Sequence, residues 1–260
     1  MHFYEATAEG VEPRHYVPLK SRPDELRPTR ITDVKKWWRE GREVMPSVTT
    51  VLNVLNKWAL NNWRIDQHLF QAHQLDPSAF GSRESYLAEV KRLTELEMDK
   101  APKAGTDIHT VLEDYARGIV PDDPVELAIC KNTNSALFEY TNYQLRQSWW
   151  NLETRFVSDV GFGGAADIYN EDWVIDYKSK QTADKFKPGK MAYIDHRMQL
   201  AAYRGGLGVP SARCANVFIC LETGEIDFHE HSEDDLQHGW EVFRHALAIW
   251  QLQNGWEAPL

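Results

Sequence analysis

The spacing of hydrophobic positions divides the chain into a helical first part and a second part that contains short strands. Apolar residues recur at helical spacing in four stretches before residue 150. These stretches cover residues 48–55, 57–100 (interrupted near Asp76-Pro77 and Gly81), 107–117 and 125–150. Ser47 or Thr49 is suited to cap the first helix, and Lys103-Ala104-Gly105-Thr106 supplies a new N-cap before the third. The first 45 residues show no periodicity, and we expect an irregular arm with one short strand there.

The period changes after residue 150. Three short segments bounded by glycine or acidic turns predict consecutive strands at residues 152–160, 164–169 and 173–179. A helix at 191–207, strands at 214–221 and 225–229, and a last helix at 233–252 follow. Tight turns make the first three strands antiparallel, whereas the helical crossover at 191–207 brings in a parallel strand. The fold class is therefore α/β, with a central mixed β-sheet flanked by helices in the order α-β-β-β-α-β.

Length and composition fit one globular domain. The 260 residues are enough for a single domain over 1–260, in which we distinguish an N-terminal arm and helical cap region (1–100), a core (101–221) and an acidic C-terminal strand and helix (222–260). The N-terminus has no basic region followed by an apolar stretch, and we expect an intracellular protein without a membrane segment. Three scattered cysteines, Cys130, Cys214 and Cys220, cannot supply the four thiolates of an iron–sulfur cluster.

The negative charge is unevenly distributed. The net charge of -10 argues against a nucleic-acid ligand if it is spread over the whole surface. However, residues 222–241 hold eight acidic residues and no lysine or arginine, whereas residues 177–190 hold five lysines and one aspartate. A basic patch therefore remains beside the segment that carries the candidate chemistry, although such a run is also typical of a solvated face.

Two carboxylates and a lysine are expected to converge on the predicted hairpin 164–179. If its turn centres on residues 170–172, Asp167 lies opposite Ile175 or Asp176, with roughly 5 Å between Cβ atoms. Asp176 and Lys178, two apart on one strand, point to the same face. Adjacent carboxylates repel unless a hard cation neutralises them, and Mg²⁺ prefers this kind of ligand. The alternative is that Asp167 caps a turn while Asp176 and Lys178 form an exposed ion pair.

Six segments, in order, resemble the PD-(D/E)XK nuclease superfamily, and most closely its RecB-type branch, which includes phage exonucleases and mitochondrial genome maintenance exonucleases. These segments are residues 46–50, Gly105 to His109 with Glu113, Glu153, Gly164 to Asp167, Asp176-Tyr177-Lys178, and Gln199-Leu200-Ala201-Ala202-Tyr203. The proline that gives the superfamily its name is replaced by Ala166. The resemblance implies a restriction-endonuclease-like core with the helical N-terminal region over the active site.

The resemblance also implies the roles of individual residues. His109, Asp167, Asp176 and the backbone carbonyl of Tyr177 would bind Mg²⁺, for which Mn²⁺ can substitute, and Lys178 would be the catalytic lysine. The remaining expectations are Glu153, Gln199 and Tyr203 as further catalytic residues, Glu113 as a partner that orients His109, and Ser47, Thr49, Thr50, Lys180, Lys185, Lys187 and Lys190 as DNA contacts.

The function implied is that of a Mg²⁺-dependent DNA exonuclease acting at single- or double-stranded ends in recombination, repair or phage DNA metabolism. A recombinase or a single-strand-binding protein is an expected partner, and a bacterial or phage-infected host cytoplasm is the expected location. Two alternatives are a structure- or sequence-specific endonuclease on the same fold, and a catalytically inactive DNA-binding accessory protein.

Overall fold

The computed structural model describes residues 1–19, 22, 24–55, 58–98 and 100–256, without the side chains of 58–60 and 100–107. The helices are α1 (Ile31–Arg39), α2 (Val48–Leu52), α3 (Trp58–Gln74), α4 (Arg83–Met98), α5 (Lys100–Ala116), α6 (Pro124–Thr141), α7 (Ile194–Gly206) and α8 (Glu233–Asn254), with short 3₁₀ helices η1 (Pro77–Ala79) and η2 (Ala183–Lys185). The strands are β1 (Phe3–Thr7), β2 (Gly10–Pro13), β3 (Tyr16–Pro18), β4 (Leu26–Pro28), β5 (Val44–Pro46), β6 (Asn151–Ser158), β7 (Phe162–Tyr169), β8 (Trp173–Lys180), β9 (Arg213–Cys220) and β10 (Ile226–His231).

A five-stranded mixed sheet in the order β10-β9-β8-β7-β6 forms the centre of the molecule. The pairs β6–β7, β7–β8 and β9–β10 are antiparallel, whereas β8 and β9 run parallel because α7 connects them. This arrangement confirms the predicted α/β class and the predicted order α-β-β-β-α-β.

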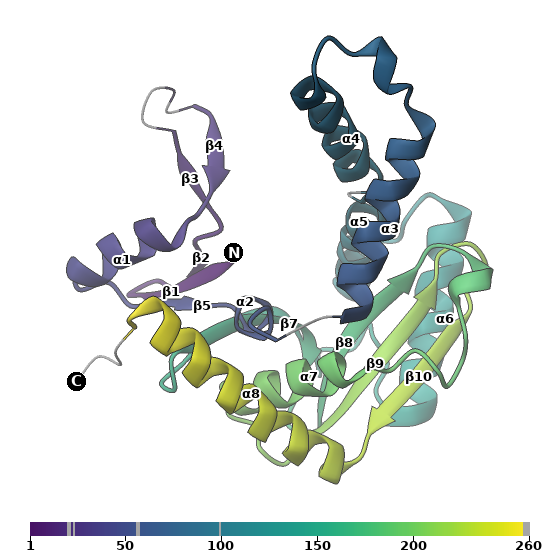
Figure 1. Ribbon diagram of the computed structural model, residues 1–260. Coiled ribbons are helices and arrows are strands. Elements are labelled where there is room, and N and C mark those ends of the chain that lie inside the picture. The colour runs from purple at the N-terminus through teal and green to yellow at the C-terminus, as the bar shows by residue number, and fades with distance from the viewer. Residues whose placement is uncertain (20–21, 23, 56–57, 99, 257–260) are drawn as a thin grey trace.

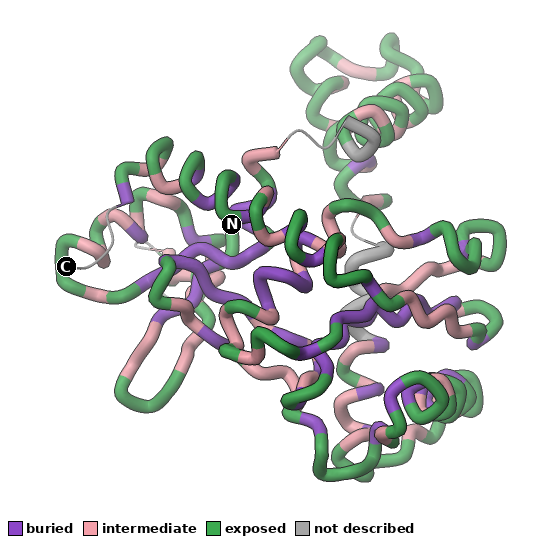
Figure 2. The backbone as a smooth tube through the Cα atoms, turned by 90° about the horizontal axis from the view of Figure 1, so that it is seen from below, coloured by how far each residue is buried: buried purple, intermediate pink, exposed green. Residues whose placement is uncertain are grey.

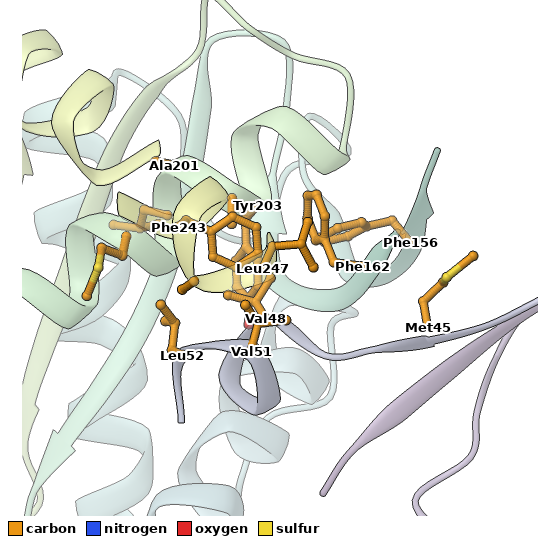
Figure 3. Close-up of a cluster of buried hydrophobic side chains, with 14 of the residues drawn as sticks. Met45, Val48, Val51, Leu52, Phe156, Phe162, Ala201, Tyr203, Phe243 and Leu247 are labelled. Atoms are coloured by element: carbon orange, nitrogen blue, oxygen red, sulfur yellow. The ribbon is translucent and has the colours of Figure 1, made fainter. Parts of the chain in front are cut away.

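Helices cover both faces of the central sheet (Figure 1). The core on one face packs α2, α7 and α8 against the sheet, and Figure 3 shows Val48 and Val51 of α2 close to Phe243 and Leu247 of α8. The core on the other face is formed by α5 and α6, with Leu112 and Leu137 fully buried. Side chains on β8 therefore alternate between two different helix layers.

The N-terminal 46 residues are more regular than the sequence suggested. β1 pairs with β2 and with β5, and β3 pairs with β4, so the prediction of an irregular arm with one strand is wrong. The strands are three to five residues long, too short for alternation to be visible in the sequence. Ser47 caps α2 by accepting a hydrogen bond from the N–H of Thr50, as predicted for one of its two candidate caps.

The helices α3 and α4 project from the body as a hairpin (Figure 1), and much of its described surface is exposed (Figure 2). The predicted interruption between them is confirmed at η1. The predicted N-cap at residues 103–106 is wrong, because α5 runs without a break through Gly105 and Thr106, whose side chains lie outside those described. None of the described helices combines the length and apolar character that a membrane span requires.

Two further helix boundaries differ from prediction. α6 ends at Thr141 rather than near residue 150, because Asn142 adopts a left-handed conformation (φ 65°) and its N–H bonds to the carbonyl of Phe138. α7 begins at Ile194 rather than at Met191, which is buried in the core instead.

Candidate metal centre

Backbone pairing between β7 and β8 is confined to the two residue pairs next to their turn, and further along, across the gap between the strands, a side chain of β7 bonds to the backbone of β8. Their register pairs Ile168 with Ile175, which matches the register predicted from the sequence, and it would set Asp167 opposite Asp176. Beyond Ile168, the Asp167 carboxylate accepts the backbone N–H of Tyr177 at 2.6 Å. The N–H and C=O of one residue lie on the same edge of a strand, so the Tyr177 carbonyl faces the same gap.

Three ligand groups surround one point beside this gap. The ligand atoms of His109 on α5, Glu153 on β6 and Asp167 on β7 all lie within 4.8 Å of one another. His109 Nδ1 is 3.2 Å from Asp167 Oδ1. Burial lowers the pKa of His109, but the charge of Asp167, its hydrogen bond to His109 and the charge of Asp176 together raise that pKa overall. Asp167 in turn has a lowered pKa, because His109 and the Tyr177 N–H outweigh its burial.

Glu153 occupies an unusual backbone position. It lies between the ladder pairs Leu152–Ile168 and Thr154–Ala166, opposite Asp167, and its φ of 42° is in the left-handed region that non-glycine residues rarely adopt. Burial, followed by the charges of Asp167 and Glu113, raises the pKa of Glu153 to about 7. Backbone strain and a shifted pKa on one carboxylate are features that concentrate at functional sites.

Asp176 and Lys178 form a second group on β8. Asp176 is buried, with 3% of its surface exposed, and its Oδ2 is 2.7 Å from Lys178 Nζ. Burial raises the pKa of Asp176 even though Lys178 acts in the opposite direction. The oxygens of Asp176 lie outside the 4.8 Å group formed by the other three ligands within the described chain. The alternative of an exposed Asp176–Lys178 pair is therefore wrong for Asp176.

The α7 residues singled out from the sequence contact this second group. Gln199 Oε1 accepts a hydrogen bond from Lys178 Nζ at 3.2 Å, and Gln199 Nε2 donates to Asp176 Oδ1 at 3.0 Å and to the Tyr203 hydroxyl at 2.8 Å. The Tyr203 ring can approach because residue 164 is glycine, where a Cβ would lie 2.9 Å from Tyr203 Cε1. The predicted one-turn spacing of Gln199 and Tyr203 thus places both beside the Asp176–Lys178 pair.

Two residues of the network were not found from the sequence. Asn216 Nδ2 donates to Asp176 Oδ2 at 2.8 Å, and Asn216 Oδ1 lies 2.8 Å from His231 Nε2. Asn216 stands in a run of apolar residues on β9 and is fully buried. A polar residue inside a buried strand requires a hydrogen-bonding partner. A single asparagine within an apolar run was therefore the feature of the sequence that could have indicated this network.

Several residues predicted for the site have contacts or burial that differ from those expected. Within the described contacts the Glu113 carboxylate pairs with Arg117 (2.5 Å) and not with His109, so its expected orienting contact is absent. Ser47 and Thr50 are buried, and Thr50 Oγ1 bonds to the backbone of His2, an environment that does not favour the expected direct contact with DNA. Thr49 is exposed.

The lysines that follow β8 differ in exposure. Lys185, Lys187 and Lys190 are exposed, whereas Lys180 is half-buried, with a pKa lowered by burial and by Lys178. In the acidic C-terminal segment, Glu233 pairs with Arg204 at 2.7 Å, and Glu230 pairs with Arg213. Part of its negative charge is therefore compensated locally.

Comparisons with known proteins give little further guidance. No family model matches the chain, and no curated protein matches it. A solved structure from Eubacterium rectale, described as a "putative exonuclease", is similar over 59% of this chain and 68% of its own, with 12% identity and a TM-score of 0.39. A second one, SSO0001, covers 46% of this chain and 55% of its own, with 18% identity and a TM-score of 0.26. Likenesses this distant establish neither a family nor a function for the chain.

Proposed function

We propose that the chain is a divalent-metal-dependent nuclease that hydrolyses phosphodiester bonds in DNA. The observation that carries this proposal is the meeting of His109, Glu153 and Asp167 within 4.8 Å, beside the Asp176–Lys178 pair. Partly buried carboxylates that face one another are costly unless a cation lies between them. The raised pKa of Glu153 reflects this cost.

The donor set fits Mg²⁺ or Mn²⁺. Carboxylate oxygens are the ligands that these hard cations prefer, and Mg²⁺ binds through one or two carboxylates together with water and phosphate oxygens. We propose His109, Glu153 and Asp167 as ligands. Asp176 is proposed as a further ligand because the strand register sets it opposite Asp167, whose carboxylate accepts the N–H of the next residue, Tyr177. When bound, such an ion polarises a phosphoryl oxygen and lowers the pKa of a water molecule.

Lys178 is proposed to act on the substrate. Within the described contacts two of its three N–H donors are used by Asp176 and Gln199, which fixes the ammonium and leaves one donor for a phosphate oxygen. A cation held in place stabilises the negative charge that develops during phosphodiester cleavage. The exposed Lys185, Lys187 and Lys190 are suited to contact the DNA backbone further from the reacting phosphate.

We propose that the substrate is a DNA end. The support is the α3–α4 hairpin, which rises beside α5, the helix that carries His109 (Figure 1). The test is digestion of linear duplexes labelled at the 5′ or the 3′ end, alongside covalently closed circles, with Mg²⁺. We expect stepwise shortening of the linear DNA, intact circles and no reaction with excess chelator. Cleaved circles would favour an endonuclease, and the absence of any metal-dependent cleavage would contradict the proposal.

Metal binding is expected to release a proton from Glu153. Because its folded pKa of about 7 lies above the ordinary value of a glutamate, Glu153 is mostly protonated at about pH 6, so affinity for Mn²⁺ should rise as the pH passes through about 7 and level off above it. Calorimetry at about pH 6 in two buffers of different ionisation enthalpy counts the protons. We expect Glu153→Gln to release about one proton fewer per ion. Glu139→Gln, at an exposed carboxylate, is the control, and an unchanged count in Glu153→Gln would refute the assignment.

A further inference from the structure

The Asp176 carboxylate is held by three donors from three different elements. Gln199 Nε2 on α7 occupies Oδ1, at 3.0 Å. Lys178 Nζ on β8 and Asn216 Nδ2 on β9 both occupy Oδ2, at 2.7 and 2.8 Å. A carboxylate has about four lone-pair positions, two on each oxygen. One position on Oδ1 therefore remains for a ligand.

Asn216 contacts both the backbone and the side chain of Asp176. Its Nδ2 also lies 3.3 Å from the backbone carbonyl of Asp176, so one amide group contacts the main chain and the side chain of the same residue. Asn216 is fully buried, and the residues on the same face of β9, Cys214 and Phe218, are apolar. The buried amide is therefore explained by its contacts with Asp176 and His231.

His231 fixes the orientation of the Asn216 amide. Its Nε2 lies 2.8 Å from Asn216 Oδ1, so the network assigns the imidazole hydrogen to Nε2 and the two amide hydrogens to Nδ2. The register β9–β10 pairs His231 with Cys214 and His229 with Asn216, which puts both histidines on the same face as Asn216. The other side of His231 lines a cavity of about 300 Å³ together with Tyr193 and Arg197.

We infer that Asn216, held by His231, is a positioning residue that restricts Asp176 to one coordinating position on Oδ1. This inference rests on the proposed function, in which Asp176 is a ligand of the ion. With Asn216 in place, binding of one ion by both oxygens of Asp176 would require displacement of Lys178 or Asn216. Without it, only Lys178 and Gln199 hold the carboxylate, and a second position opens on Oδ2. Residues that orient metal ligands in this way typically change metal affinity 10- to 100-fold.

The test compares Asn216→Leu and His231→Leu with His231→Gln, which keeps an N–H donor. The control is Val217→Ala, a core substitution on the opposite face of β9. We would measure the Mn²⁺ dissociation constant by calorimetry, the Tm of the metal-free chain, and kcat and KM with DNA. We expect Mn²⁺ binding to weaken by about 10- to 100-fold in the two leucine variants, with KM for DNA unchanged, and by less than about 3-fold in His231→Gln and Val217→Ala.

Two results would overturn the inference, and they are distinguishable. If the leucine variants lower Tm as Val217→Ala does but bind Mn²⁺ like the unmodified chain, Asn216 is only structural. If the unmodified chain binds no Mn²⁺ and cleaves no DNA, the proposed function fails first and this inference fails with it. Should Asn216→Leu not fold, His231→Leu decides the question, because the cavity beside His231 can accommodate the change.

Discussion

Replacing Asp167 by asparagine is expected to lower Mg²⁺-dependent DNA cleavage by at least about 10³-fold, equivalent to about 4 kcal/mol in the barrier. Asp167 lies between the other two candidate ligands, because it contacts His109 and lies opposite Glu153. Asparagine keeps an oxygen that can accept the N–H of Tyr177, so the junction between β7 and β8 should survive. The loss would then come from the missing charge at the metal centre.

The experiment on Asp167→Asn measures initial rates on end-labelled duplex over a range of Mg²⁺ concentrations. A shift of the whole curve to higher Mg²⁺ would indicate weaker ion binding, which is the expected cause. Asp159→Asn, at an exposed aspartate in the β6–β7 turn, is the matched control and should cleave at the normal rate. Normal activity in Asp167→Asn would place the reaction elsewhere in the molecule.

Replacing Lys178 by methionine is expected to separate catalysis from ion binding. Methionine has a similar length but no charge, so the ammonium proposed to contact the substrate phosphate is lost, while His109, Glu153 and Asp167 are unchanged. We expect kcat to fall by about 10²- to 10³-fold, the scale seen when one group that stabilises developing charge is removed. Mn²⁺ affinity should not weaken, because Lys178 is not a ligand and its removal takes a positive charge away from the site.

Asp167→Asn and Lys178→Met are expected to impair different steps, ion binding and catalysis respectively. Asp167→Asn should respond to added metal, whereas Lys178→Met should stay slow at saturating metal. Lys131→Met, at an exposed lysine on α6, controls for the loss of one positive charge. A Lys178→Met protein with full kcat would exclude Lys178 from the chemistry.

Local sequence signals were sufficient for the hairpin that carries the candidate site. Asn170 Oδ1 accepts the N–H groups of Asp172 and Trp173, which closes the predicted turn and fixes the register of β7 and β8. Once that register is fixed, the positions of Asp167 and Asp176 follow. The same holds for Gln199 and Tyr203, because a spacing of four residues on a helix determines which side chains share a face.

Contacts between distant segments could not be predicted in this way. β1 is five residues long and is stabilised by pairing with β5, some forty residues later. The resemblance leads us to expect Glu153 at the site, but no residue pattern predicts the left-handed backbone conformation that it adopts there. Asn216 and His231 reach Asp176 only because β9 and β10 are added to the sheet beside β8. Each of these features depends on the tertiary structure.

The central claim is that His109, Glu153 and Asp167 hold a divalent cation, and anomalous diffraction from crystals soaked in Mn²⁺ tests it most directly. We expect an anomalous peak at about 2.0–2.3 Å from a nitrogen of His109 and from carboxylate oxygens of Glu153 and Asp167. At a Mn²⁺ concentration that just saturates the unmodified protein, the peak should be much weaker in Asp167→Asn crystals. No peak at these residues under saturating Mn²⁺, or a peak of unchanged height in the variant at the same concentration, would contradict the claim.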